Sequence, residues 1–319
     1  MKNGSFVISL DFELLWGVRD HRTIEDYGQN ILGARKAIPV ILELFKKYGI
    51  HATWATVGFL FFDEKKDLLS GCPELRPAYV NSELSPYSKI QQIGENEGVD
   101  PYRFGKSLLE LIKSYPGQEI GSHTFCHYYC QEPGQTKETF RADIVAAVKA
   151  ADSCGLSLRS LVFPRNQSNE EYLSTCSEVG ITCFRGTEPS WFYRNGSRQG
   201  ESKFTRAMRL ADSYINLSGH NTFHITKGTG LINVPSSRFL RPYNRKLAFA
   251  DPLRLHRITS SIRHAAKKSE AYHLWWHLHN FGLNLIENIS FLTEILDCFA
   301  SMKARYGMRS LSMSEGANG

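Results

Sequence analysis

Two histidines four residues apart, His123 and His127, are the residues of this chain best suited to metal chemistry. They lie in the segment EIGSHTFCHYY, after a short apolar approach and a glycine. In a turn of helix, side chains at i and i+4 share one face, roughly 6 Å apart, so two such imidazoles can converge on one ion. The spacing also arises by chance, and Thr124 stands where a zincin helix carries glutamate. A hydrolase site therefore needs a carboxylate ligand, a base and an acid from elsewhere in the chain.

Two acidic residues, Asp11 and Glu13, follow the apolar segment 5–10 (SFVISL), which reads as a buried strand. Residues i and i+2 of a strand point the same way, so both carboxylates would emerge together at its carboxyl end. One carboxylate of such a pair can bind a cation while the other accepts a proton. The alternative is a solvated strand end, or carboxylates paired with nearby arginines.

Composition restricts the class of protein. The 319 residues, 42% of them apolar, can bury one large core, a size typical of single-domain α/β barrels. The net charge of +6 is dispersed, which argues against a nucleic-acid partner. Seven cysteines without a C-x-x-C pair predict neither a disulfide framework nor a zinc knuckle. The chain shows no signal-peptide core and no apolar run that could span a bilayer, so we expect a soluble, cytoplasmic protein or a peripheral one.

The elements that must position these residues alternate between helix and strand. Residues 30–48 have helical apolar spacing, interrupted by Pro39, and residues 49–60 read as a second buried strand. This alternation predicts a parallel sheet with crossover helices. Residues 60–100, rich in Gly, Pro and Asn, read as an insertion that is either a substrate lid or decoration. We predict an amphipathic helix at 284–306 and a disordered tail at 313–319.

Taken in order, these motifs resemble the polysaccharide deacetylase family, also called the NodB-homology family or carbohydrate esterase family four. The resemblance rests on the acidic pair after the first strand, the segment GIHATWATVGF and the motif H-T-x-x-H, and it extends from about residue 5 to residue 282. It implies a distorted (β/α) barrel of about seven strands, with residues 1–319 forming a single catalytic domain. The family's acidic pair is adjacent, whereas Phe12 separates the two acids here.

The resemblance, combined with the residue chemistry, assigns the reacting groups. A divalent ion held by Glu13, His123 and His127 would have two nitrogen ligands and one oxygen ligand, and zinc is the first choice for such a set. Asp11 would accept the proton of the attacking water. His277, near the end of the apolar segment AYHLWWHL, resembles the family's general acid.

Further residues are expected around the substrate. The family's third motif places an arginine that orients the catalytic aspartate, and Arg165 matches it, although it follows Pro164 instead of preceding prolines and so either reaches Asp11 or points at substrate. Its neighbour Asn166 is expected to bind substrate. Trp191 matches a tryptophan that lines the sugar site in the family, although a core tryptophan fits equally. His279 lies on the same side of its strand as His277 and is the second candidate for the acid.

These assignments predict a metal-dependent hydrolase that removes an N-acyl group, in first place acetyl, from an amino sugar during cell-surface polysaccharide synthesis. Residues 236–268 carry nine basic side chains, among them Arg238, Arg241 and Arg245, against one acid. Such a run is either a solvated helix face or a site for the diphosphate of a nucleotide-linked or lipid-linked substrate. The alternatives are a sugar N-deformylase of the same mechanism and a non-catalytic sugar-binding relative.

Overall fold

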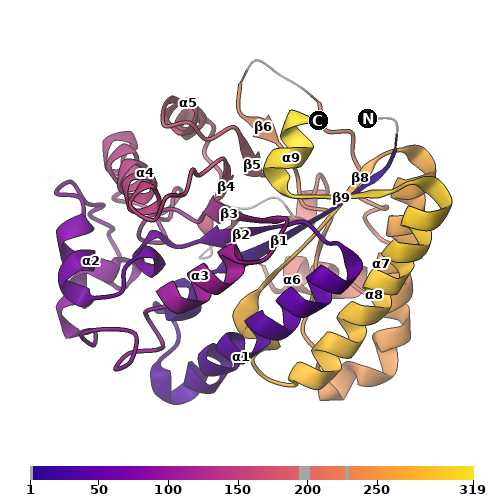
Figure 1. Cartoon of the computed structure of the whole chain (residues 1–319), viewed down its shortest axis with the longest axis horizontal. Coiled ribbons are helices and arrows are strands. Elements are labelled where there is room, and N and C mark those ends of the chain that lie inside the picture. Colours follow the sequence, from indigo (N-terminus) through magenta and orange to yellow (C-terminus); the bar gives the residue numbers. More distant parts are fainter. Residues whose placement is uncertain (1–2, 194–201, 227–229) are drawn as a thin grey trace.

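The computed structural model describes residues 3–193, 202–226 and 230–319, and a curled parallel sheet dominates it (Figure 1). The strand order is β6-β5-β4-β3-β2-β1-β8-β7, with β9 paired to β1, and every pairing is parallel. The eight-strand path forms a half-barrel, which confirms the predicted α/β barrel fold. The strands are β1 (Ser5–Phe12), β2 (Ala52–Thr56), β3 (Gln118–Ser122), β4 (Ser160–Val162), β5 (Cys183–Arg185), β6 (Ile232–Asn233), β7 (Arg238–Phe239), β8 (Ala271–His277) and β9 (Arg309–Leu311).

Strands β6 and β7 lie at opposite edges of the sheet. They belong to one short segment of the chain, residues 232–239, which therefore contacts both edges. Val234 donates its backbone N–H to the carbonyl of Phe184 next to β6 (2.9 Å), and Leu240 donates to the carbonyl of Trp275 in β8 (2.8 Å). The segment therefore pairs first with β5 and then with β8. If β6 and β7 are counted as one strand, the path has seven strands, the number that the resemblance implied.

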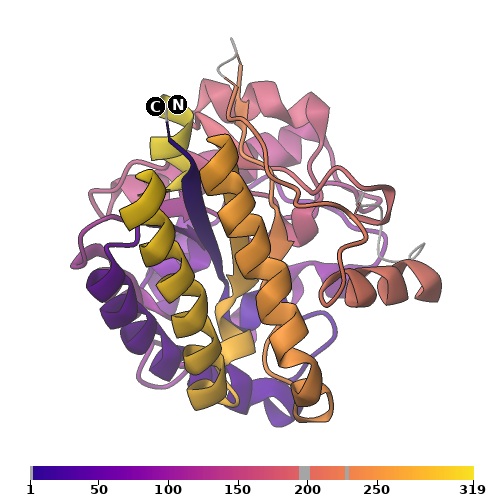
Figure 2. The same cartoon turned by 90° about the vertical axis from the view of Figure 1, so that its right-hand side faces the viewer.

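Helices cover the outer face of the sheet, and α1, α7 and α8 pack beside one another (Figures 1 and 2). α1 begins at a capping box in which Thr23 and Asp26 satisfy each other's backbone amides, six residues before the predicted start, and it continues through Pro39. The helices are α1 (Ile24–Tyr48), α2 (Lys65–Gly71), α3 (Lys106–Lys113), α4 (Lys137–Asp152), α5 (Glu170–Glu178), α6 (Lys203–Asp212), α7 (Asp251–Lys268), α8 (Leu285–Tyr306) and α9 (Met313–Asn318). Within the described residues, no helix combines the length and apolar character needed to cross a membrane.

Strand β1 separates two apolar clusters by the alternation of its side chains. Phe6 and Ile8 belong to the large cluster beneath the helices, whereas Val7 belongs to a small cluster with Met313 and Ala317 of α9. The prediction of a disordered tail was therefore wrong. Ser312 and the side chain three residues on form a capping box, and the apolar side chains of α9 are buried at the end of the barrel where β1 begins (Figure 1).

The segment 60–100 contributes α2 and short 3-10 turns, and none of its residues joins the barrel sheet. It packs against the loop that carries the histidine pair, since the Tyr79 hydroxyl accepts the backbone N–H of Tyr129 at 2.8 Å. The backbone N–H of Ala78 also donates to the carbonyl of Gly134 at 2.9 Å. This part of the segment thus supports the wall of the site described below.

Candidate metal centre and active site

The predicted metal ligands meet where the parallel strands end. Glu13 follows β1 and His123 follows β3, while His127 lies further along the same loop. The loop is not the helical turn that the four-residue spacing suggested, because Thr124 (φ 63°) and His127 (φ 60°) adopt left-handed backbone conformations. Two side chains four residues apart therefore converge through a tight irregular turn.

The three ligand atoms form a compact, buried group. Oε2 of Glu13 lies 3.2 Å from Nε2 of His123 and 3.1 Å from Nε2 of His127, and all three side chains are at most 3% exposed. His123 donates its Nδ1–H to the carbonyl of Val162 at 2.8 Å, which leaves the lone pair on Nε2 facing Glu13. Two imidazole nitrogens and one carboxylate oxygen within 4.8 Å of one another fit a divalent ion of the zinc class.

Electrostatics at this group favour the metal-binding protonation states. Burial would raise the pKa of Glu13, but the surrounding histidines His277, His123 and His127 outweigh it and hold that pKa well below its ordinary value. Burial lowers the pKa of His127 to about 3. An ionised carboxylate beside the neutral imidazole of His127 is the form in which these two groups bind a cation.

The strained loop is held by hydrogen bonds from α4 and from its own side chains. The Asp143 carboxylate accepts the backbone N–H groups of Phe125 (2.7 Å) and Cys126 (3.1 Å). The Thr124 hydroxyl accepts the N–H of Tyr128 at 2.7 Å. These bonds fix the backbone between the two histidines, where left-handed conformations are otherwise costly for residues with a side chain.

The predicted base, Asp11, is paired with an arginine that the sequence analysis missed. Arg185, the last residue of β5, donates Nη1 to Oδ1 of Asp11 (2.7 Å) and Nη2 to Oδ2 (2.9 Å). Burial would raise the pKa of Asp11, but Arg185 and the neighbouring His123 and His277 lower it. One feature of the sequence could have identified Arg185: it is a charged residue at the end of a buried apolar strand. An unpaired guanidinium would be costly there, so a partner is expected.

A line of polar side chains inside the barrel continues behind this ion pair. Arg185 Nη1 also donates to the Ser9 hydroxyl at 2.9 Å, and Ser9 in turn lies 2.8 Å from Nε2 of His273. Burial lowers the pKa of His273 to about 3, so its neutral ring accepts the Ser9 hydroxyl proton. The Asn166 side-chain oxygen accepts Nε and Nη2 of Arg185 at 3.2 and 2.9 Å. Asn166, predicted to bind substrate, therefore also orients the arginine.

Arg165 does not reach Asp11. Its guanidinium pairs with Asp20, lies 3.5 Å from Glu132 and stacks over the ring of Tyr129 at 4.1 Å. The backbone of Arg165 is left-handed (φ 56°), and this turns the side chain along the pocket wall. The resemblance implied that Arg165 orients Asp11. In the structure, Arg185 makes that contact with Asp11.

The two predicted histidines, His277 at the end of β8 and His279 in the 3-10 helix Leu278–Phe281 that follows, differ in exposure. His277 is 29% exposed in its side chain, with Nε2 lying 3.5 Å from Oδ2 of Asp11 and 3.9 Å from Oε1 of Glu13. His279 is 6% exposed, its Nδ1 lies 3.6 Å from Oε1 of Glu13, and burial lowers its pKa to about 4. The rings stack with centroids 5.1 Å apart. His277 is thus the more accessible of the two to a substrate.

One pocket of about 1430 Å³ connects these groups with aromatic and basic side chains. Trp191, 57% exposed, lines it and stacks on Phe204 with ring centroids 6.4 Å apart. Trp275 of β8, which the sequence analysis did not single out, also lines the pocket and lies beneath the Arg185 guanidinium at 4.1 Å. Trp275 is only 9% exposed, whereas the exposed indole face of Trp191 suits the apolar face of a sugar ring.

The fold and this site define an α/β barrel with a candidate metal-hydrolase centre at the carboxyl ends of its strands. Residues 26–184 match the family model described as polysaccharide deacetylase. The match includes His123 and His127 but not Asp11, Glu13 or His277, which lie outside its bounds. The match spans just under half of the chain, and over these residues the chain is similar to polysaccharide deacetylases, which are hydrolases.

Comparison with solved structures shows the same fold. A presumed polysaccharide deacetylase from Mycobacterium smegmatis has a TM-score of 0.60 at 12% identity, with 99% of this chain and 90% of that chain covered. Another from Pseudomonas aeruginosa PAO1 has a TM-score of 0.56 at 10% identity, covering 98% and 89%. A 4-alpha-glucanotransferase from Thermococcus litoralis has a TM-score of 0.54 at 13% identity, covering 100% of this chain and 40% of that chain. No curated protein matches the chain.

Proposed function

We propose that this protein is a metal-dependent hydrolase that removes the N-acetyl group of an amino sugar. The observation that carries the proposal is the convergence of Glu13, His123 and His127 beside the Asp11–Arg185 ion pair. Asp11, Glu13 and His277 all line one pocket. A metal ligand, a base with a fixed orientation and the proposed acid therefore face the same pocket. The polysaccharide deacetylase match supports the reaction type.

The metal ligands fit a divalent ion, for which zinc is our first choice. When bound, such an ion supplies Lewis acidity, which makes water more acidic and polarises an acyl carbonyl. The carboxylate of Glu13 and the Nε2 atoms of His123 and His127 would hold it. The Val162 carbonyl keeps the His123 ring in the tautomer needed for this role.

Asp11 accepts the proton of the attacking water. Its carboxylate is held by both guanidinium nitrogens of Arg185, which keeps it ionised and fixes its direction. Because Arg185 is itself anchored by Ser9 and Asn166, the carboxylate cannot rotate freely as charge moves. A base oriented in this way spends little reorganisation energy during the reaction.

His277 donates a proton to the departing amine. Its Nε2 lies 3.5 Å from Asp11, and its partial exposure leaves the ring accessible from the pocket. The amide nitrogen is a poor leaving group until it is protonated, so an acid on this side completes the reaction. His279 and Trp191 line the same pocket and are proposed to contact the sugar.

The proposed setting is the cytoplasm, with a nucleotide-linked or lipid-linked amino sugar made for a surface polysaccharide. All seven cysteines are free thiols, five of them buried, which suits a reducing compartment. Contact with a membrane surface would be peripheral.

The test is release of the acyl group from a panel of N-acetylated amino sugars by zinc-loaded protein, read as acetate and, separately, as formate. Acetate release that falls at least a thousandfold in Asp11→Asn supports the proposal, because this change removes the base while keeping the size of the side chain. Formate release alone would identify a deformylase. Turnover that survives Asp11→Asn would remove the catalytic assignment.

A further inference from the structure

The pocket extends from the reacting groups to one face of α6, a helix that stands apart from the layer of α7 and α8 (Figure 2). Ser202, Thr205, Arg206 and Arg209 line the pocket, and their spacing of three, four and seven residues places them on one side of the helix. Ser213, directly after α6, continues this face. Two guanidiniums therefore belong to the pocket wall at α6.

A third arginine joins them from the segment after β7. Arg241 lines the pocket, is half-buried and donates its Nε to the Ser213 hydroxyl at 2.7 Å. Burial lowers the pKa of Arg241, and the positive charges of Arg209 and Arg238 lower it further. Among the described residues, no carboxylate forms an ion pair with Arg241 or Arg206. Like charges gathered in this way are stabilised by an anion.

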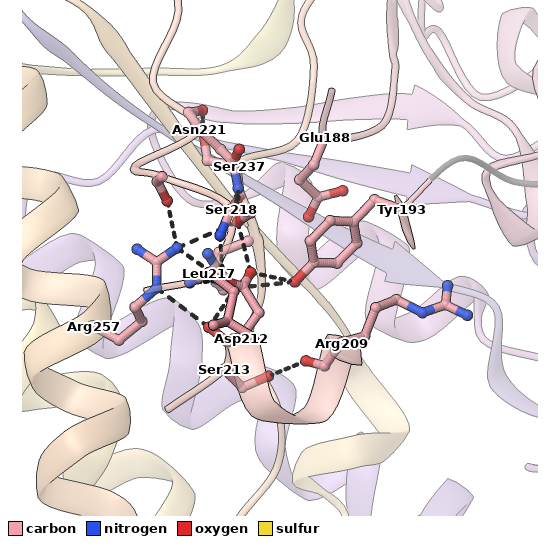
Figure 3. A network of polar contacts seen from close by, with 12 residues as sticks. Glu188, Tyr193, Arg209, Asp212, Ser213, Leu217, Ser218, Asn221, Ser237 and Arg257 are labelled. Atoms are coloured by element: carbon pink, nitrogen blue, oxygen red, sulfur yellow. Dashed lines mark hydrogen bonds and ion pairs between the residues drawn. The ribbon is translucent and has the colours of Figure 1, made fainter. Parts of the chain in front are cut away.

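The buried residue Asp212 anchors this wall to the barrel (Figure 3). It accepts Nη1 of Arg238 at 2.6 Å, the Ser218 hydroxyl at 2.7 Å and the Tyr193 hydroxyl at 2.8 Å, and it lies 3.4 Å from Nη2 of Arg257. The carboxylate therefore faces two guanidiniums and fixes the end of α6. The cluster keeps a net positive charge and holds Arg238, which also lines the pocket, in place.

Glu188 is the acid that lines this end of the pocket among the described residues, and it does little to offset the charge. Glu188 lines the pocket, is 4% exposed and lies 2.9 Å from the Ser236 hydroxyl. Burial raises the pKa of Glu188, which favours its neutral form. At the other end, Asp11 is paired with Arg185 and Glu13 faces the histidines. Within the described part of the chain, positive side chains thus gather on the α6 side of the pocket, away from the carboxylates of the reacting centre.

We propose that Arg206, Arg209 and Arg241 form a subsite for a phosphate or diphosphate ester carried by the substrate. The inference rests on the proposed function and extends it, because it states how the charged end of the amino-sugar substrate is bound. Several guanidiniums on one wall suit the spread charge of a phosphate better than a single carboxylate. Of the arginines that the sequence analysis singled out, Arg238 is bound to Asp212 and Arg245 lies outside the pocket lining, so Arg241 alone belongs to the subsite.

Binding of pyrophosphate to the full-length protein, measured by isothermal titration calorimetry with and without added zinc, tests the subsite directly. We expect Arg241→Gln to weaken binding about tenfold, since a charge-assisted hydrogen bond is lost. Arg206→Gln should act in the same direction, and because Arg206 is exposed on α6 this variant should fold normally. Arg245→Gln removes the same charge outside the pocket and should bind like the wild type. Equal binding by all four proteins would overturn the proposal.

Substrate comparison separates this inference from the proposed function. Acetate release is measured from a nucleotide-diphosphate amino sugar, a lipid-phosphate amino sugar and a neutral N-acetylated oligosaccharide. Preference for either phosphate-bearing substrate should fall about tenfold in Arg241→Gln, and the preferred one identifies the source of the phosphate. If the neutral oligosaccharide is used as well as the phosphate-bearing substrates, the subsite is refuted and the deacetylase assignment stands. Arginine-dependent pyrophosphate binding without acetate release would refute the deacetylase but keep the subsite.

Discussion

Replacing Arg185 with methionine removes the guanidinium that faces Asp11 and keeps most of the buried volume. Asp11 is 2% exposed and Arg185 is 1% exposed, so no solvent takes the place of the lost charge. For charges about 4 Å apart at an effective dielectric constant of about 20, the lost attraction is about 4 kcal/mol, or about three pKa units. Removing one partner of a buried ion pair typically destabilises a protein by about 3–5 kcal/mol.

The sign of the pH effect follows from the burial of Asp11. In the wild type, Arg185 is the main group opposing the burial that would raise the pKa of Asp11. Without Arg185, burial dominates and the pKa rises, so the ionised base exists only at higher pH. We expect the acidic limb of the kcat/KM profile to move to higher pH. In Arg185→Met, folding must protonate Asp11 or bury its charge without a partner, and either costs more at pH 7 than at pH 4. The loss of folding stability should therefore be larger at pH 7.

The assay is acetate release as a function of pH, together with urea unfolding at pH 4 and pH 7. Arg165→Met is the matched control, because Arg165 pairs with Asp20 and Glu132 and makes no contact with Asp11. Its acidic limb should coincide with that of the wild type. An unmoved limb in Arg185→Met, or an equal shift in Arg165→Met, would refute this account of the base.

Four further variants test the site and its supports. A Cβ atom at Gly17 would overlap the Glu13 carboxylate, so Gly17→Ala should cost at least tenfold in zinc affinity with little change in circular dichroism. The pKa of Asp212 is lowered to about 2, because its arginines outweigh the effect of burial. Asp212→Asn should therefore lower the free energy of unfolding above pH 4, and this loss should shrink as the pH falls towards 2. His277→Asn should reduce kcat at least a hundredfold and more than His279→Asn, measured by acetate release at saturating substrate.

The parts of the site that lie on strand ends were predictable from sequence. The alternation in β1 placed Asp11 and Glu13 on one side, and the structure brings Glu13 together with both histidines of the H-x-x-x-H motif. Strand periodicity is a local property of the chain, so it can be read from the sequence without knowledge of the tertiary fold. His277, the last residue of β8, was placed by the same reasoning, whereas His279 lies in the 3-10 helix Leu278–Phe281, where strand periodicity does not apply.

Of the two placements that the sequence left open for Arg165, the structure does not show contact with Asp11, and backbone conformation is the reason. The motif placed Arg165 after a strand, but the left-handed backbone at Arg165 and Asn166 turns the guanidinium away from Asp11. Such conformations are rare for residues with a side chain, and the local sequence does not predict them here. Arg185 comes from a strand further along the chain, so only the curl of the sheet brings it to β1. The ordering of α9 likewise depends on burial against the barrel, which composition alone does not show.

The zinc content of the purified protein tests the central claim most directly. Wild-type protein is stripped with a chelator, reloaded with zinc, dialysed and measured by elemental analysis beside Glu13→Gln, His123→Ala and His127→Ala. The account predicts about one ion per chain in the wild type and loss of that ion in each variant, with Arg165→Met as a folded control that retains it. A wild type that cannot be loaded, or an ion that remains bound in all three ligand variants, would contradict the assignment of this site.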